Sequence, residues 1–186
     1  MPGQEQPTDR LMVMVRGRVA LVRVIGRGSF KVSTTLKDFA AAAIEQGAAR
    51  VVLDMSACAG MDSTFMGVLA GLSMRLQKVA EGRVVLVNLS LKTRNLLGTL
   101  GLDLLVEPHM AEDVPAEYAA LLLEDAGLQT AAAPADDRFR TAATMLEAHE
   151  NLVKISPDNL PKFKDVLEYL REDVRRGHAS PGAGGV

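Results

Sequence analysis

Two patterns of apolar positions alternate along the first hundred residues. Continuous runs rich in β-branched and other apolar residues are typical of strands in a sheet. They occupy 11–15, 19–25, 51–55 and 83–89, and a shorter run lies at 104–106. Between the later runs, apolar residues recur at helical steps. The clearest set is Phe65, Leu69, Leu72, Leu76 and Val79. The order predicted for 11–106 is therefore two strands followed by three helix–strand pairs.

Small residues mark the ends of these elements. Gly17 lies between the first two strands and can supply the positive φ of a tight turn, which predicts a hairpin. The glycines of 26–29 are expected to break the second strand, and their spacing is too incomplete for a phosphate-binding loop. Ser33–Thr35 offers N-caps to the next helix, and Gly47 is its expected stop.

Alternating strands and helices predict an α/β fold with a mainly parallel sheet, flanked by helices, and an antiparallel N-terminal hairpin. A C-terminal helical extension follows the sheet domain. The expected organisation is a disordered lead at 1–10, the sheet domain at 11–108, the helical extension at 109–176 and a flexible tail at 177–186.

The extension contains two long segments with helical spacing, joined to the sheet domain by a helix at 116–126 and a linker at 128–135. The first segment spans 136–154, and the second restarts at Ser156-Pro157. Their apolar stripes are Phe139, Ala143, Leu146 and Val153, then Phe163, Val166, Leu167, Leu170 and Val174. Such helices must pack on each other, on the sheet domain or on a second protein, and the first two are favoured.

Composition narrows the function. The 186 residues are 48% hydrophobic with a net charge of −2, which gives no basic field for nucleic acid. One cysteine excludes an internal disulfide and suits a reducing compartment. Three scattered histidines have no metal-ligand spacing, so neither a metal nor a cofactor is expected. No signal peptide or membrane-length apolar run is present, which predicts a cytoplasmic protein without membrane insertion.

The junction between a predicted buried strand and the following helix contains Asp62, Ser63 and Thr64. All three residue types are common N-caps, so capping alone would explain them. However, loops at the carboxyl ends of strands often carry function in α/β sheets, and a helix N-terminus favours an anion. A phosphate on Ser63 would leave the fold intact and add about −2 charge to an interface.

Catalysis is not expected. Ser63 lacks the Gly-x-Ser-x-Gly elbow, and no histidine has a spacing that identifies it as a base. His109 follows the last strand without a supporting acid, and Cys58 has no basic neighbour to activate its thiol. The chain is therefore predicted not to be an enzyme.

Two stretches, VVLDMSACAGMDSTFMGVLAGL and GRVVLVNLSLKTRNLLGTLGLDLL, resemble the STAS domain of anti-sigma factor antagonists. The shared features are, in order, a strand ending in Asp54, the loop of Met61 to Thr64, Asn88-Leu89-Ser90, Arg94 and Leu100-Gly101-Leu102. The resemblance covers about 11–106.

This resemblance implies a phosphorylation switch at Ser63. In the family, the serine after the loop aspartate is phosphorylated by a partner that is both anti-sigma factor and serine kinase. The unphosphorylated antagonist binds that partner and frees sigma, and a PP2C-type phosphatase restores it. Asp62 is implied to shape the loop, with Thr64 as a secondary hydroxyl. The family glycine after the hydroxyl pair is replaced here by Phe65, which bears on which kinase docks.

The expected partner surface centres on the Asp62–Thr64 loop and the neighbouring loop at 27–33. Its contact residues are predicted to be Arg27, Lys31, Ser33, Met61, Phe65 and Met66. A homodimer through the C-terminal helices is a further possibility. Alternative readings are a STAS subunit of an ABC-type lipid transport complex and a signalling scaffold that is not phosphorylated.

Overall fold

The computed structural model describes residues 8–124, 127–135 and 137–178. Its strands are β1 (Arg10–Arg16), β2 (Val19–Gly28), β3 (Arg50–Asp54), β4 (Cys58–Met61), β5 (Arg83–Leu89), β6 (Glu107–Met110) and β7 (Gln129–Thr130). Its α-helices are α1 (Phe30–Glu45), α2 (Ser63–Leu76), α3 (Leu91–Thr99), α4 (Ala116–Leu122), α5 (Arg138–Ile155) and α6 (Leu160–His178). Two 3₁₀ turns, η1 (Leu102–Leu104) and η3 (Pro157–Asn159), complete the described elements.

One mixed sheet forms the centre of the fold. Its strand order is β6-β5-β3-β2-β1-β7, and β4 pairs with the far end of β2. The neighbours β2–β3, β3–β5, β5–β6 and β2–β4 are parallel, whereas β1 is antiparallel to both β2 and β7. Gly17, with φ of +55°, lies in the two-residue turn of the β1–β2 hairpin. The predicted α/β class, parallel sheet and N-terminal hairpin are confirmed.

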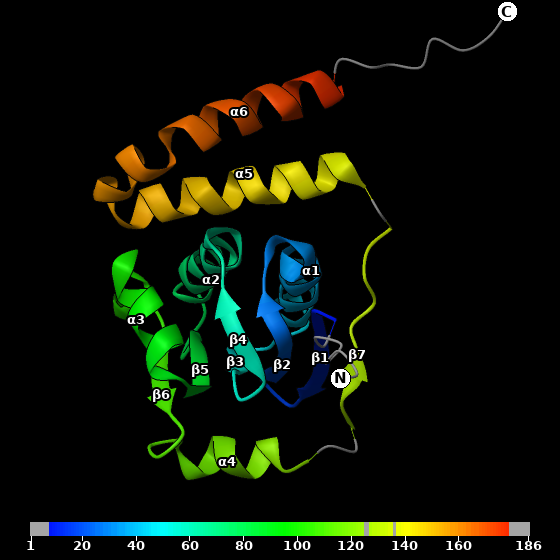
Figure 1. Cartoon of the computed structure of the whole chain (residues 1–186). Helices are drawn as coiled ribbons and strands as arrows, with labels where there is room; N and C mark the ends of the chain where they lie inside the picture. The colour runs from blue at the N-terminus through cyan, green and yellow to red at the C-terminus, as the bar shows by residue number, and fades with distance from the viewer. Residues whose placement is uncertain (1–7, 125–126, 136, 179–186) are drawn as a thin grey trace, which may run out of the picture.

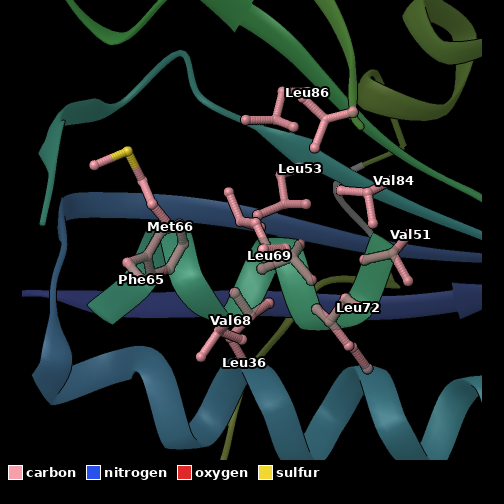
Figure 2. Packing of buried hydrophobic residues seen from close by; sticks show 14 of the residues in the cluster. Leu36, Val51, Leu53, Phe65, Met66, Val68, Leu69, Leu72, Val84 and Leu86 are labelled. Carbon is pink, nitrogen blue, oxygen red and sulfur yellow. The ribbon is translucent and has the colours of Figure 1, made fainter. Parts of the chain in front are cut away.

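Because successive side chains of a strand point to opposite faces, the central strands build two cores. The larger core packs residues such as Leu53 and Leu86 against α1 and α2, with Phe65 and Leu69 fully buried. Figure 2 shows these apolar side chains gathered between α2, α1 and the strands. On the opposite face, a smaller core closes around Tyr118 of α4. The sheet is thus covered on both sides.

The helices α5 and α6 form an antiparallel pair, called the α5–α6 hairpin here (138–178), outside the α1–α2 layer. Figure 1 shows α5 lying across α1 and α2, with α6 outermost. A Cβ added to Gly67 of α2 would lie 2.2 Å from the carbonyl oxygen of Ala148 on α5. Glycine is therefore what allows the two helix backbones to approach so closely. The predicted packing of the helical pair on itself and on the sheet domain is confirmed.

Two predicted boundaries near the start of α1 are wrong. β2 runs through the glycines of 26–29 and ends at Gly28, with Gly26 at φ +82° beside a bulge in the β2–β4 pairing. The helix then begins at Phe30, so Ser33–Thr35 lies inside α1 rather than at its cap. These three hydroxyl residues are buried, and Ser33 Oγ donates to the carbonyl of Ser29 at 2.9 Å.

The other differences concern short elements. The sequence did not predict β4, the last strand lies at 107–110 instead of 104–106, and β7 forms within the expected linker. The expected disordered lead and flexible tail fall mostly outside the described residues. Where they are described, Arg10 opens β1 and His178 ends α6, so these two positions belong to regular elements.

The apolar stripe predicted for α5 is not its buried face. Phe139 of that stripe is half exposed, and Ala143 is exposed. The buried residues of α5 are Ala142, Thr144, Ala148, His149, Asn151 and Leu152. Small and polar side chains therefore make much of the contact with α1 and α2, together with Leu152, which joins the larger core.

Candidate functional site

The predicted phosphoacceptor loop lies where two parallel strands end side by side. Gly28 of β2 pairs with Met61 of β4, and the amide of Asp62 donates to the carbonyl of Gly28 at 2.9 Å. The chain then enters α1 after Gly28 and α2 after Met61. The N-termini of both helices therefore meet at the carboxyl edge of the sheet, the position where α/β folds place functional groups.

Asp62 joins these two helix N-termini. Its Oδ1 accepts a hydrogen bond from the amide of Phe65 at 2.9 Å, which makes Asp62 the N-cap of α2. Its Oδ2 accepts from the amide of Phe30, the first residue of α1, at 2.8 Å. Each such bond satisfies an otherwise unpaired helix donor and contributes about 1 kcal/mol. One carboxylate thus fixes the geometry of both helix entries.

Ser63 is the first residue of α2, and its hydroxyl does not cap the helix. Ser63 Oγ lies 3.0 Å from Nε2 of His149 on α5, and Nδ1 of His149 lies 2.7 Å from the carbonyl oxygen of Met145. A carbonyl only accepts, so Nδ1 carries a proton. In the neutral ring Nε2 is then the acceptor, and Ser63 donates its hydroxyl proton to it.

His149 is the site residue that the sequence did not predict. It is 3% exposed, and its ring meets Phe163 of α6 edge-on with centroids 5.0 Å apart. The sequence pattern identified no histidine as the partner of Ser63, and the structure places His149 beside it. The two residues are 86 positions apart. Only the docking of α5 brings them together, so no local spacing could have found the pair.

The Ser63–His149 pair has the separation of a nucleophile and its base. However, the imidazole is oriented by the backbone carbonyl of Met145, whereas serine hydrolases orient it with a carboxylate. The ring is also buried between α2, α5 and α6. In this arrangement His149 holds the hydroxyl of Ser63 in place as a hydrogen-bond acceptor.

The comparisons with known proteins bear on this loop. The sequence model of the STAS domain matches residues 10–116, more than half of the chain. The chain belongs to the STAS domain family. The α5–α6 hairpin lies beyond the matched residues, although α5 contributes the contact to Ser63.

Solved structures give the same fold. The anti-sigma factor antagonist SpoIIAA in its unphosphorylated form matches with a TM-score of 0.50 and 23% identity, over 61% of this chain and 95% of that chain. A putative anti-sigma factor antagonist from Thermotoga maritima matches with a TM-score of 0.50 and 17% identity, over 60% of this chain and 93% of its own. No curated protein sequence matches.

The predicted partner-contact residues of the STAS domain divide into two groups. Arg27 and Lys31 are exposed beside the loop. The other four are buried in this conformation: Ser33 is 0%, Met61 5%, Phe65 0% and Met66 4% exposed. Thr64, the predicted second hydroxyl, is 3% exposed. Only Arg27 and Lys31 are therefore displayed for contact.

Phe65, which replaces the family glycine, points into the core instead of toward the acceptor surface. A Cβ on Gly28 would lie 2.8 Å from the Phe65 ring, so the ring fills the space above that glycine. Phe65 thus acts on the loop through packing, while its own side chain is out of reach of a docking protein.

Asp54, at the end of β3, belongs to a separate polar cluster of the STAS domain. Its carboxylate accepts from Arg23 Nε at 2.8 Å, from Asn88 Nδ2 at 2.9 Å and from the amide of Ser56 at 3.0 Å. Burial raises the pKa of Asp54, but the hydrogen bonds from Asn88, Ser56 and Arg23 outweigh it and leave the pKa below its ordinary value. Arg23 also donates to the carbonyl of Leu122 at 3.1 Å, which links β2 to the end of α4. The cluster holds strands and α4 together.

The other candidate groups are placed in structural roles. Cys58 lies on β4, half-buried, and burial raises the pKa of its thiol, which disfavours the reactive thiolate. His109 on β6 bonds to Glu107 at 2.9 Å. Within the described ranges, no cluster of three or more His, Cys, Asp or Glu side chains is arranged to hold a metal ion. Among the described helices, none has the length and apolar character to cross a membrane.

Proposed function

We propose that this chain is an anti-sigma factor antagonist whose protein binding is switched by phosphorylation of Ser63. In the unphosphorylated state it binds an anti-sigma factor that is also a serine kinase, and sigma is released in the cytoplasm. A PP2C-type phosphatase reverses the modification. Membership of the STAS domain family supports this proposal, as does the fold shared with two proteins named as anti-sigma factor antagonists.

The observation that carries the proposal is that Asp62 caps α2 and the hydroxyl of Ser63 does not. Asp62 supplies the cap of α2, so the hydroxyl of Ser63 is not needed for capping. Ser63 nevertheless stands at the first position of the helix and is only half-buried. The simpler explanation of the loop, in which its hydroxyls are there to cap the helix, therefore does not apply to Ser63.

A phosphate at this position would act on binding without disrupting the fold. The positive end of the α2 dipole favours an anion at the first turn. The same phosphate adds about −2 charge beside Arg27 and Lys31, on the edge where a partner is proposed to dock. Desolvating that charge would oppose the complex. In this proposal the chain is a binding protein and has no catalytic activity of its own.

The first test is peptide-level mass spectrometry of the protein purified from its own cells, with and without phosphatase treatment. The proposal expects a phosphatase-sensitive phosphate on the peptide that carries Ser63. Absence of phosphate across growth and stress conditions would count against the switch. Co-purification with an ABC-type ATPase in that case would favour a transport subunit instead.

Substitutions then test the consequence for binding. We expect Ser63→Ala to keep its affinity for the anti-sigma factor and Ser63→Asp to lose about tenfold or more, a difference of about 1.4 kcal/mol. Gln129→Glu, which adds the same charge at the exposed β7 edge, is the matched control and should bind like the parent. Equal affinities of the Ala and Asp variants, with equal melting temperatures, would contradict the proposal.

A further inference from the structure

The α5–α6 hairpin lies directly over the proposed phosphorylation site. Figure 1 shows α5 crossing the α1–α2 layer, and His149 of α5 stands 3.0 Å from the Ser63 hydroxyl. A protein kinase must take a serine hydroxyl into its own active site, and a docking partner must touch the surrounding face. A helix at hydrogen-bond distance from this half-buried hydroxyl obstructs both.

The contact between the hairpin and the sheet domain combines apolar packing with polar bonds. Ala148 and Leu152 of α5 belong to the larger core. Thr144 Oγ1 bonds to Thr34 Oγ1 at 3.2 Å, and Asn151 Nδ2 donates to the Gly67 carbonyl at 3.4 Å. Leu152 is the one large apolar side chain among the six residues that α5 buries. Polar contacts between units of one chain resemble those of transient complexes, because water can replace the bonds when the units separate.

Two further features indicate a contact that can open. The ion pairs across it, Lys37 with Glu147 and Asp38 with Arg140, have exposed side chains, and exposed pairs contribute little to stability. A cavity of about 80 Å³ also remains between α1, α2 and α5. It is lined by residues of all three helices, including Val68, so the surfaces do not fill the space completely.

The face beneath α5 is nevertheless shaped for a helix. A Cβ on Gly67 would lie 2.2 Å from the Ala148 carbonyl oxygen, and one on Gly71 would lie 2.5 Å from Asn151 Nδ2. These glycines lie one turn apart on α2, and their missing side chains leave space for a helix that has a small residue at the crossing point. The sequence supplies that residue on α5 as Ala148, which is 1% exposed.

We propose that the α5–α6 hairpin is a cover in cis, which occupies the α1–α2 face and shields Ser63 until it is displaced. The hydrogen bond from Ser63 to His149 helps to hold the hairpin in the docked position. A kinase or partner reaches Ser63 only after the hairpin has lifted. The regulatory meaning rests on the proposed function, but the shielding can be tested without a kinase.

The test measures how fast a thiol at position 63 reacts in the full-length chain. Ser63→Cys is treated with N-ethylmaleimide, and labelled peptides are quantified by mass spectrometry, with Cys58 on β4 as the internal reference. Gly67→Ala is added to push the hairpin away from the α2 side, and Ala148→Glu to push it away from the α5 side. Gly98→Ala on α3, where a Cβ meets nothing closer than 3.8 Å, is the matched control.

The cover predicts at least tenfold faster labelling of position 63 in both opening variants, with Gly98→Ala equal to the parent and the Cys58 rate unchanged. Equal rates at position 63 in parent and opening variants would overturn it. So would a parallel rise of both thiols in both variants, since the protection would then belong to the global fold. The two proposals can fail separately. If position 63 is protected from labelling but Ser63 never carries phosphate in cells, the cover is supported and the proposed function is contradicted.

Discussion

Asp62 and Ser63 are neighbours in sequence, but their side chains point to different parts of the molecule. The carboxylate of Asp62 stays within the loop and caps α1 and α2 together. The hydroxyl of Ser63 points away from its own helix, to His149 of α5. Because the loop geometry depends on Asp62, a modification of Ser63 can change the contact with α5 while both helix entries remain capped.

The buried carboxylate of Asp54 makes the stability of the fold depend on pH. It is 2% exposed, and its folded-state pKa lies below the ordinary value of 3.8. A lowered folded pKa gives stability that is fully present above the unfolded pKa and is lost as pH falls through the folded pKa. We therefore expect the free energy of unfolding to decline below about pH 4, with Asp54 contributing part of the slope.

The variant Asp54→Asn tests this. It removes the charge that pairs with Arg23, and breaking such a pair costs on the order of 3 kcal/mol at pH 7. Urea titrations between pH 2.5 and 7 should show this cost shrinking as pH falls below about 4, because the parent carboxylate becomes protonated. Asp113→Asn, at an exposed bend, should leave the profile unchanged. A cost that stays constant down to the lowest pH would show that the charge of Asp54 is not the cause.

At the scale of elements, β2 and α2 fit together through Gly28 and Phe65. The ring is fully buried, and a Cβ on Gly28 would lie 2.8 Å from it, closer than carbon atoms pack. We expect Gly28→Ala to destabilise the domain by about 1–3 kcal/mol through overpacking. Gly60→Ala, on the neighbouring strand β4, is the control, since its Cβ would meet only the flexible end of Lys92 at 3.9 Å.

A double-mutant cycle assigns the effect to this contact. Phe65→Leu removes part of the ring volume, so Gly28→Ala should cost at least 1 kcal/mol less in that background. Urea denaturation of the four proteins measures the difference. Additive costs would place the strain elsewhere in β2.

The elements also show what the sequence could and could not predict. Runs such as 83–89 are buried on both faces, so their apolar pattern alone identified the strand, and Asp62 was correctly expected at the start of α2. By contrast, β4 is short and contains Cys58, Ala59 and Gly60, which carry no strand signal. The contact face of α5 was missed for a related reason. In the sequence, the small and polar residues of this face are typical of a solvent-exposed surface. They are buried because Gly67 allows α5 to approach α2 closely.

At the scale of the whole molecule, one part of the site depends on a contact that no local sequence pattern contains. The loop was found because a strand–helix junction is visible in the sequence, whereas its contact with His149 arises only when two distant parts of the chain dock. The apolar residues Leu167 and Leu170 of α6 are buried within the hairpin. A homodimer through these residues would therefore first require the hairpin to open.

The layered arrangement predicts that the molecule opens in two stages. β3 and β5 lie at the centre of the sheet with side chains such as Val52 and Leu86 fully buried. By contrast, α5 packs on the outside of the α1–α2 layer through Leu152 and several small and polar side chains, and α6 lies outermost (Figure 1). Native-state hydrogen exchange at increasing urea should therefore show α5 and α6 amides exchanging through a partial opening, at lower free energy and with weaker urea dependence than those of β3 and β5. Gly67→Ala should lower the opening free energy of α5 and α6 and leave that of β3 nearly unchanged, because its Cβ meets the hairpin backbone. If α5 instead exchanged with the same free energy and urea dependence as β3, the hairpin would be an inseparable part of the core, and Ser63 would be shielded for as long as the protein stays folded.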